Sequence, residues 1–263
     1  MVALLAVVVA ALVFARPASA AAPWVDRSLT LPRLVFSGDA GFGVAHQRFA
    51  RVDTTGAGMN LEAALGITDA IEIGLRTGIR FGDDGRTLSA DAYGRTLFTE
   101  TFGTNGDTVA NPELRARWAL YSGRIVEVGL DGRFYMPVEQ GAHAGVMFGV
   151  PLAFHVGNFM RIDTGVYVPV VFAPDIGTVI SVPGYFWFQV SHRVWLGPMI
   201  ALRHVSPGPV RSHDDVLAGL GVGYQVASAI DLKWMLLFPN VNADVDRARV
   251  WGAGFGLQFR LGE

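Results

Sequence analysis

The sequence predicts an all-β protein, a closed antiparallel up-and-down transmembrane β-barrel of about twelve strands. Three observations predict this fold. Apolar residues alternate with polar residues or glycine over segments of about ten residues, turns of two or three residues alternate with longer polar links, and an apolar stretch opens the chain. Alternation is typical of strands with one apolar face, and short and long connections on opposite rims are typical of transmembrane barrels.

The N-terminal stretch has the features of a signal peptide. Residues 1–15 form an unbroken apolar run, and Ala18 and Ala20 supply the small residues of a cleavage site. The run is shorter than the ~20 residues of a spanning helix. We therefore expect residues 1–20 to be a cleaved signal peptide, 21–32 an N-terminal periplasmic segment and 33–263 the barrel. A structural N-terminal helix is the alternative for the first residues.

Composition excludes several classes of protein. The 263 residues are 51% hydrophobic and 17% charged, with a formal net charge of −2. Such a chain has ample apolar surface to bury, which excludes disorder, and it has no basic block that would bind nucleic acid. It contains no cysteine, so disulfides, thiol catalysis and cysteine-based metal sites are excluded.

The clearest strand covers residues 71–81. Ile71, Ile73 and Leu75 lie on one face, whereas Glu72 and Arg76 lie on the other. As a helix, the same segment would scatter its arginines around the whole circumference. A similar strand at 59–67 precedes it, and residues 68–70 join the two as a tight hairpin.

The same hairpin unit repeats along the chain. We expect the remaining strands at residues 34–44, 113–121, 126–136, 144–156, 159–172, 179–190, 194–203, 216–226, 230–238 and 250–261. Five hairpins with short turns and two terminal strands give an even count of twelve, with strands near the 9–11 residues that span a membrane. A soluble β-sandwich is the rival fold, but its outer face should be polar. The longest link, residues 82–111, is polar and its role is not assigned.

Two segments carry a resemblance to a known superfamily. The hairpin at residues 65–74 and the final strand at 250–261, which looks like a C-terminal assembly signal, resemble the outer-membrane β-barrels of Gram-negative bacteria. The chain is similar to uncharacterised transporter-like barrels of the phenol-degradation-associated type. The resemblance implies a bacterial outer-membrane location, contact with outer-membrane lipids and use of the barrel-assembly machinery during biogenesis. It concerns architecture and says little about function.

The inward faces of the strands carry charges of both signs in nearly equal number. The charged residues expected to line the lumen are Glu62, Glu72, Arg76, Arg80, Glu113, Arg115, Arg117, Glu127, Asp131, Arg133, Arg161, Asp163, Asp231, Lys233 and Arg260. One interpretation is a ladder of cross-strand ion pairs that fills and rigidifies the lumen. The other is a narrow polar passage in which paired charges orient a solute. The pattern alone does not choose between them.

A second sector of the lumen is aromatic and methionine-rich. Its expected members are Met147, Tyr167, Tyr185, Trp187, Trp195 and Met199. This sector suits an amphipathic or aromatic solute, and ordinary packing inside a partly filled barrel is the alternative.

Catalytic and cofactor motifs are weak in this sequence. His204 and Ser206 share one strand face, which resembles the His-x-Ser of outer-membrane phospholipases, but the asparagine that would orient the histidine is missing and Asp214 and Asp215 are the nearest candidates. No phosphate loop or metal motif occurs. We expect no enzyme activity, no metal and no cofactor.

Prolines mark one side of the predicted barrel. Pro151, Pro183 and Pro198 fall inside predicted strands. Because proline cannot donate to the ladder, each is expected at a bulge or kink, or alternatively where a strand leaves the membrane.

The sequence thus favours a passive outer-membrane channel or transporter for small molecules, with amphipathic solutes among the candidates. The alternatives are an outer-membrane lipid hydrolase and a non-conducting structural or surface-recognition barrel.

Overall fold

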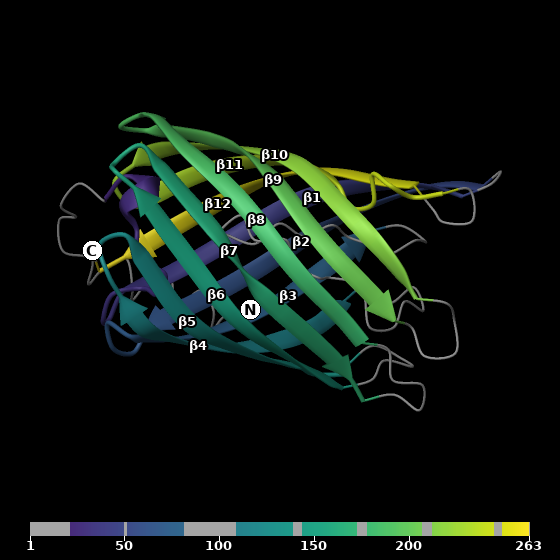
Figure 1. Cartoon of the computed structure of the whole chain (residues 1–263), viewed down its shortest axis with the longest axis horizontal. Helices are drawn as coiled ribbons and strands as arrows, with labels where there is room; N and C mark the ends of the chain where they lie inside the picture. Colours follow the sequence, from purple (N-terminus) through teal and green to yellow (C-terminus); the bar gives the residue numbers. More distant parts are fainter. Residues whose placement is uncertain are drawn as a thin grey trace.

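The predicted all-β barrel is confirmed. The computed structural model describes residues 22–49, 52–81, 109–138, 144–172, 178–206, 212–244 and 249–262. Twelve strands in these ranges form one closed barrel (Figure 1). They are β1 (Phe36–Phe49), β2 (Val52–Gly66), β3 (Ile71–Phe81), β4 (Val109–Ser122), β5 (Val126–Tyr135), β6 (Gly145–Val156), β7 (Met160–Val171), β8 (Thr178–Ser191), β9 (Val194–Ser206), β10 (His213–Ala227), β11 (Ile230–Phe238) and β12 (Arg249–Leu261).

Each strand pairs antiparallel with its neighbours in chain order, and β1 closes the ring against β12. In that closing pair Phe42 lies opposite Phe255, while on its other edge Phe42 lies opposite Met59 of β2. Closure removes the open edges that would leave backbone groups without hydrogen bonds in lipid.

The two faces of the wall have opposite polarity. Ile71, Ile73 and Leu75 of β3 are 40–47% exposed on the outside, whereas Glu72 and Arg76 between them are buried inside. A soluble protein buries its apolar face, so this inverted arrangement is that of a barrel with lipid around it. No helix in the described part of the chain is long and apolar enough to cross a membrane.

The first hairpin is longer than expected. The sequence predicts a polar link between residues 44 and 59, but the β1–β2 ladder continues to Phe49 and Val52, and it projects beyond the other strands (Figure 1). The prediction of a link was wrong because backbone pairing does not require an apolar face. Polar side chains can pair across such a ladder in water, as His46 Nδ1 and Thr55 Oγ1 do at 3.0 Å. Of the expected 82–111 link, residues 82–108 lie outside the described residues.

The prolines interrupt pairing without shifting the register. Pro151 lies in a gap of the β5–β6 ladder and Pro183 in a gap of the β7–β8 ladder, and the same register holds on both sides of each gap. On the other edge of its strand, each proline is still paired. The described ladders therefore have no bulge at Pro151, Pro183 or Pro198, and the alternative of a kink stays a prediction. Gly165 has a φ of +153°, and a Cβ there would lie 2.5 Å from Val150 O. Glycine thus lets the two backbones approach closely.

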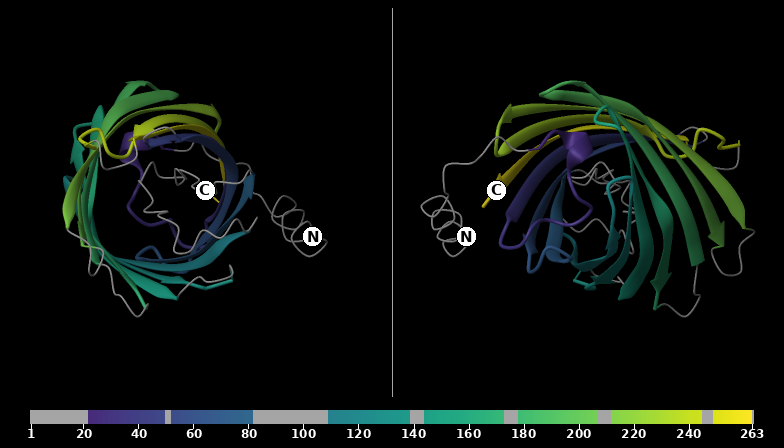
Figure 2. Two further views of the ribbon diagram at one scale, coloured as in Figure 1. Left: turned by 90° about the vertical axis from the view of Figure 1, so that its right-hand side faces the viewer. Right: turned by 60° about the vertical axis from the view of Figure 1, so that its left-hand side comes forward.

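The segment before β1 folds back into the barrel. Residues 22–35 cross the end of the lumen where the short turns lie, and they include the 3₁₀ turn η1 (Trp24–Asp26) (Figure 2). Val25, Leu29 and Leu31 are at most 3% exposed. The sequence places residues 21–32 on the periplasmic side as a separate segment, and the structure adds that residues 22–32 belong to the interior of the barrel.

Candidate functional site

A belt of alternating charges lines the lumen on β2–β5. Arg115 contacts Glu62 at 2.9 Å and also bonds Glu72, and Arg133 contacts Glu113 at 2.8 Å and Asp131 at 3.3 Å. Each of these described charges is close to one of opposite sign, which makes this part of the lumen wall a set of paired charges. This arrangement matches the ion-pair ladder considered from the sequence.

The structure also places the other predicted charged residues. Arg76 and Arg117 complete the belt through Glu113 at 3.8 Å and Asp131, and Arg161 pairs with Asp163 at 2.8 Å on β7. Three further predicted residues, Glu127, Arg161 and Asp231, form hydrogen bonds or ion pairs with the N-terminal segment. Lys233 bonds Gln258 at 2.8 Å, and Gln258 and Arg260 line a cavity together with residues of the N-terminal segment. The side chain of Arg80 lies outside the described part of the structure.

The predicted aromatic sector divides into two clusters. Met147 and Tyr167 pack with Tyr135 between the charged belt and β8. Tyr185, Trp187, Trp195 and Met199 form the second and larger cluster, together with Ala201, Leu217, Met235, Leu237 and two residues of the N-terminal segment, Trp24 and Val25. We call the inward side chains of this larger cluster on β8–β11 the aromatic wall. It lies across the lumen from the charged belt.

The N-terminal segment is fixed to the barrel through its backbone. Glu127 Oε2 accepts a hydrogen bond from the Leu29 N–H at 3.0 Å, and Glu72 Oε2 accepts one from the Leu31 N–H at 2.8 Å. His155 of β6 adds a third contact with the backbone of the segment, since its Nδ1 lies 2.7 Å from Val25 O. An extended segment without a strand partner needs such acceptors, because each buried N–H left without one costs about 1–3 kcal/mol.

Two side chains of the segment reach the opposite side of the lumen. Trp24 stacks on Trp195 of the aromatic wall, with ring centroids 5.0 Å apart and an interplanar angle of 2°. Arg27 donates to both carboxylate oxygens of Asp231, at 2.5 and 3.1 Å. The segment therefore bridges the belt and the aromatic wall and obstructs the short-turn end of the lumen.

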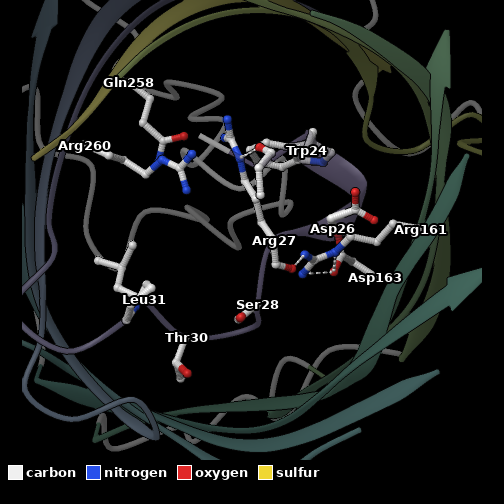
Figure 3. Close-up of a pocket in the computed structure, with 12 residues that line it drawn as sticks. Trp24, Asp26, Arg27, Ser28, Thr30, Leu31, Arg161, Asp163, Gln258 and Arg260 are labelled. Atoms are coloured by element: carbon white, nitrogen blue, oxygen red, sulfur yellow. Dashed lines mark hydrogen bonds and ion pairs between the residues drawn. The ribbon is translucent and has the colours of Figure 1, made fainter. Parts of the chain in front are cut away.

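The obstruction is not complete. A cavity of about 110 Å³ lies between the segment and strands β7 and β12, and Arg27, Asp163, Gln258 and Arg260 are among the residues that line it (Figure 3). The polar lining can hold water, so the interior around the segment is not a dry core.

The residues considered for catalysis lie on the outer surface near the long-link end. His204 Nδ1 is 2.7 Å from Asp214 Oδ1 on the adjacent strand, and both side chains are exposed. The structure thus supplies an orienting carboxylate for the histidine. In the described part of the chain, no hydrogen bond joins Ser206 to His204.

Sequence reasoning missed the residues that hold the segment. Trp24, Arg27, His155 and Gln189 were not among the predicted site residues, although Gln189 Oε1 lies 3.4 Å from the Val25 N–H and His155 bonds Glu127. One signal was present: Val25, Arg27, Leu29 and Leu31 alternate with small or polar residues directly before the first strand. Such alternation predicts an extended segment with one buried face.

Comparison with known proteins shows which solved structures share this architecture. No protein-family model matches the chain, and no curated protein sequence matches it. Solved structures do. The COG4313 outer membrane channel from Pseudomonas putida F1 has a TM-score of 0.62 and 11% identity, over 88% of this chain and 96% of that one. The NanC porin has a TM-score of 0.60 and 8% identity, over 84% of this chain and 98% of that one. The KdgM porin has a TM-score of 0.52 and 7% identity, over 83% of this chain and 98% of that one.

The chain therefore has the fold of the outer-membrane β-barrels of Gram-negative bacteria, as its hairpins and last strand indicated. These three structural neighbours are a channel and two porins. The identities are low, so the likeness defines the architecture, and the function must be argued from this chain's own lumen.

Proposed function

We propose that this protein is an outer-membrane channel for small amphipathic molecules, and that its N-terminal segment closes the short-turn end until it moves. The observation that carries the proposal is the two-sided lumen. One side is the charged belt of β2–β5 and the other is the aromatic wall of β8–β11. The segment contacts the belt through the Leu31 N–H at Glu72, and it contacts the opposite side through Trp24 and Arg27. A solute with one polar and one apolar face contacts both sides at once.

The contacts of the segment support a closure that is reversible. The barrel is closed by its own ladder without the segment, since all twelve strands pair with one another. The segment adds a limited number of hydrogen bonds, one arginine–aspartate pair and one stacked ring. Elements held by few contacts open at lower free energy than the body of a fold. The architecture of porins and channels in the neighbours agrees with this role.

Uptake into liposomes tests the proposal. Purified protein in sealed vesicles should admit small amphipathic solutes such as aromatic amines faster than sugars of equal mass. A variant lacking residues 22–32 should admit both faster, because it lacks the closure. Vesicles that stay impermeable with the shortened variant would instead support a non-conducting structural barrel.

A lipid hydrolase is the second candidate, and one contact favours it. The His204–Asp214 pair at 2.7 Å faces the lipid side at the end of β9, where an ester group of a lipid could reach Ser206. In such a site Ser206 would attack and His204 would take its proton. Hydrolysis of a fluorogenic phospholipid by the purified protein, lost in Ser206→Ala, would support this function. Equal rates with both proteins would exclude it.

The proposed partners follow from the fold. Outer-membrane lipids surround the exposed apolar face, and the barrel-assembly machinery inserts the chain during biogenesis. Depletion of that machinery should leave the protein unfolded in the periplasm, which its heat-dependent mobility in gels can report.

A further inference from the structure

Trp24 and Arg27 occupy one compact site on the aromatic wall. The Trp24 ring lies parallel to Trp195 at 5.0 Å, and its edge meets Trp187 with centroids 6.2 Å apart and an angle of 79°. Arg27 donates two hydrogen bonds to Asp231. Trp187, Trp195 and Asp231 belong to β8, β9 and β11, so they remain in the wall when the segment leaves.

Two groups at this site are buried while the segment is bound, and the described strands supply neither with a hydrogen-bonding partner. In the described part of the chain, Arg27 alone bonds the carboxylate of Asp231, which is 2% exposed. The indole N–H of Trp187, 3% exposed, has no acceptor among the described residues. A buried carboxylate without a cation is strongly unfavourable, and a buried N–H without an acceptor is unusual in native proteins.

Lys233, on the same strand as Asp231, favours one kind of ring at this site. Lys233 Nζ lies 4.6 Å from the centre of the Trp24 ring and is held there by Gln258 at 2.8 Å. Any ring in the place of Trp24 therefore has an indole on one face and an ammonium close by. Stacking and cation–π attraction both favour a flat, electron-rich aromatic ring.

We infer that this is a solute-binding site that the N-terminal segment fills with its own side chains, and that the solute replacing them carries an aromatic ring and a cationic nitrogen. The inference rests on the proposed function and names its solute class. The ring takes the place of Trp24 on Trp195, and the cationic nitrogen takes that of Arg27 at Asp231. A solute that also carries a hydrogen-bond acceptor can bond the Trp187 N–H. An anionic aromatic solute is rejected because it leaves Asp231 unpaired.

The inference also explains how the closure opens. The solute and the segment compete for one site, so a solute that binds the wall shifts the segment toward its released state. Since the segment is tethered, its local concentration is high, and the solute must bind the wall well to displace it. Solutes without the ring or the cation do not compete.

Labelling of a single cysteine tests this competition directly. The chain has no cysteine, so Val25→Cys introduces a unique thiol at a position that is 0% exposed while the segment is bound. The probes are tryptamine, indole-3-acetate with the same ring and a carboxylate, and n-butylamine with the cation alone. Tryptamine should raise the rate of maleimide labelling of the folded protein about tenfold or more, the range expected for a charge-assisted hydrogen bond. The other two probes should not change it.

Matched variants separate the site from general loosening. In Asp231→Asn the tryptamine effect, relative to that variant's own baseline, should disappear. Asp215→Asn removes another buried aspartate that pairs with an arginine, Arg203 at 2.7 Å, and should keep the effect. Equal responses to all three probes, no response to tryptamine, or a response that survives in Asp231→Asn would overturn the inference. If Val25→Cys does not fold, Leu31→Cys, 3% exposed, gives the same measurement.

The labelling measurement and the liposome measurement fail independently. A tryptamine response without solute passage would contradict the proposed channel while leaving the site in place. Solute passage without a tryptamine response would keep the channel and remove the assigned solute class.

Discussion

His155 Nε2 of β6 lies 2.8 Å from Oε1 of Glu127 on β5, and both side chains also contact the backbone of the N-terminal segment. The same imidazole reaches Val25 O, and the same carboxylate accepts the Leu29 N–H. Because the carbonyl and the carboxylate are both acceptors, the ring bonds both only when each of its nitrogens carries a hydrogen. The pair therefore forms a clamp on the backbone of the segment.

Removing the clamp should release the segment more often. In Glu127→Ala the Leu29 N–H loses its acceptor, which costs about 1–3 kcal/mol, so labelling of Val25→Cys should be faster by about tenfold. Glu127→Gln keeps an oxygen for Leu29 and should have a smaller effect. The heat-dependent gel mobility of both variants should show an intact barrel. Labelling as slow in Glu127→Ala as in the parent protein would mean that the clamp holds nothing.

The charged belt should matter for stability as a set of pairs. Asp131 bonds both Arg117 and Arg133, so Asp131→Ala removes a carboxylate that two buried guanidinium groups share, although Arg133 keeps Glu113. The change should lower the free energy of unfolding by about 3–5 kcal/mol. Replacing both partners, Asp131→Leu with Arg117→Met, should cost less than the single change. Urea unfolding in detergent measures both. A double variant less stable than the single one would contradict the paired belt.

The lipid-facing stripe should reject charge. Leu75 is 47% exposed on the outside of β3, near the predicted middle of the membrane. The substitution Leu75→Arg should therefore lower the stability of the barrel by about 2–4 kcal/mol. Gly256→Arg is the inward control, since the nearest atoms to a Cβ there are 3.7–3.8 Å away and one of them is a carboxylate oxygen of Asp39. Refolding yield into lipid vesicles compares them. Equal yields would mean that the assignment of faces is wrong.

The two rims should lie on opposite sides of the outer membrane. Asn158 is exposed in the short turn between β6 and β7, and Asp244 is exposed in the link between β11 and β12. With a single cysteine at each position, intact cells should label Asp244→Cys and not Asn158→Cys. The reverse pattern would place the N-terminal segment at the outer surface.

The sequence predicted the barrel because alternation reports directly on faces. The run from Ile71 to Phe81 has an unambiguous period of two, and its partner strands follow by the same pattern. It also identified inward residues such as Arg115 and Trp195, whose burial follows from their position in the alternation. The ladder of β1 beyond Val44 was missed, because the face that carries Phe42 and Val44 continues with His46 and Arg48, which ends the apolar alternation.

The closure could not be predicted from periodicity. The contacts of Trp24 with Trp195 and of Arg27 with Asp231 join residues about 170 and 200 positions apart in the chain. A stacked ring and an ion pair leave no repeat in the sequence. The sequence therefore predicted a periplasmic segment before the barrel, but the place of that segment in the lumen came only from the structure.

Single-channel conductance tests the central claim most directly. The protein and a variant lacking residues 22–32 would be recorded in planar bilayers at the same voltage and salt. If the N-terminal segment closes the lumen, the full protein should show low conductance with rare openings, and the shortened variant should be open for most of the record at a higher conductance. Equal conductance and equal open times in the two proteins would contradict the account.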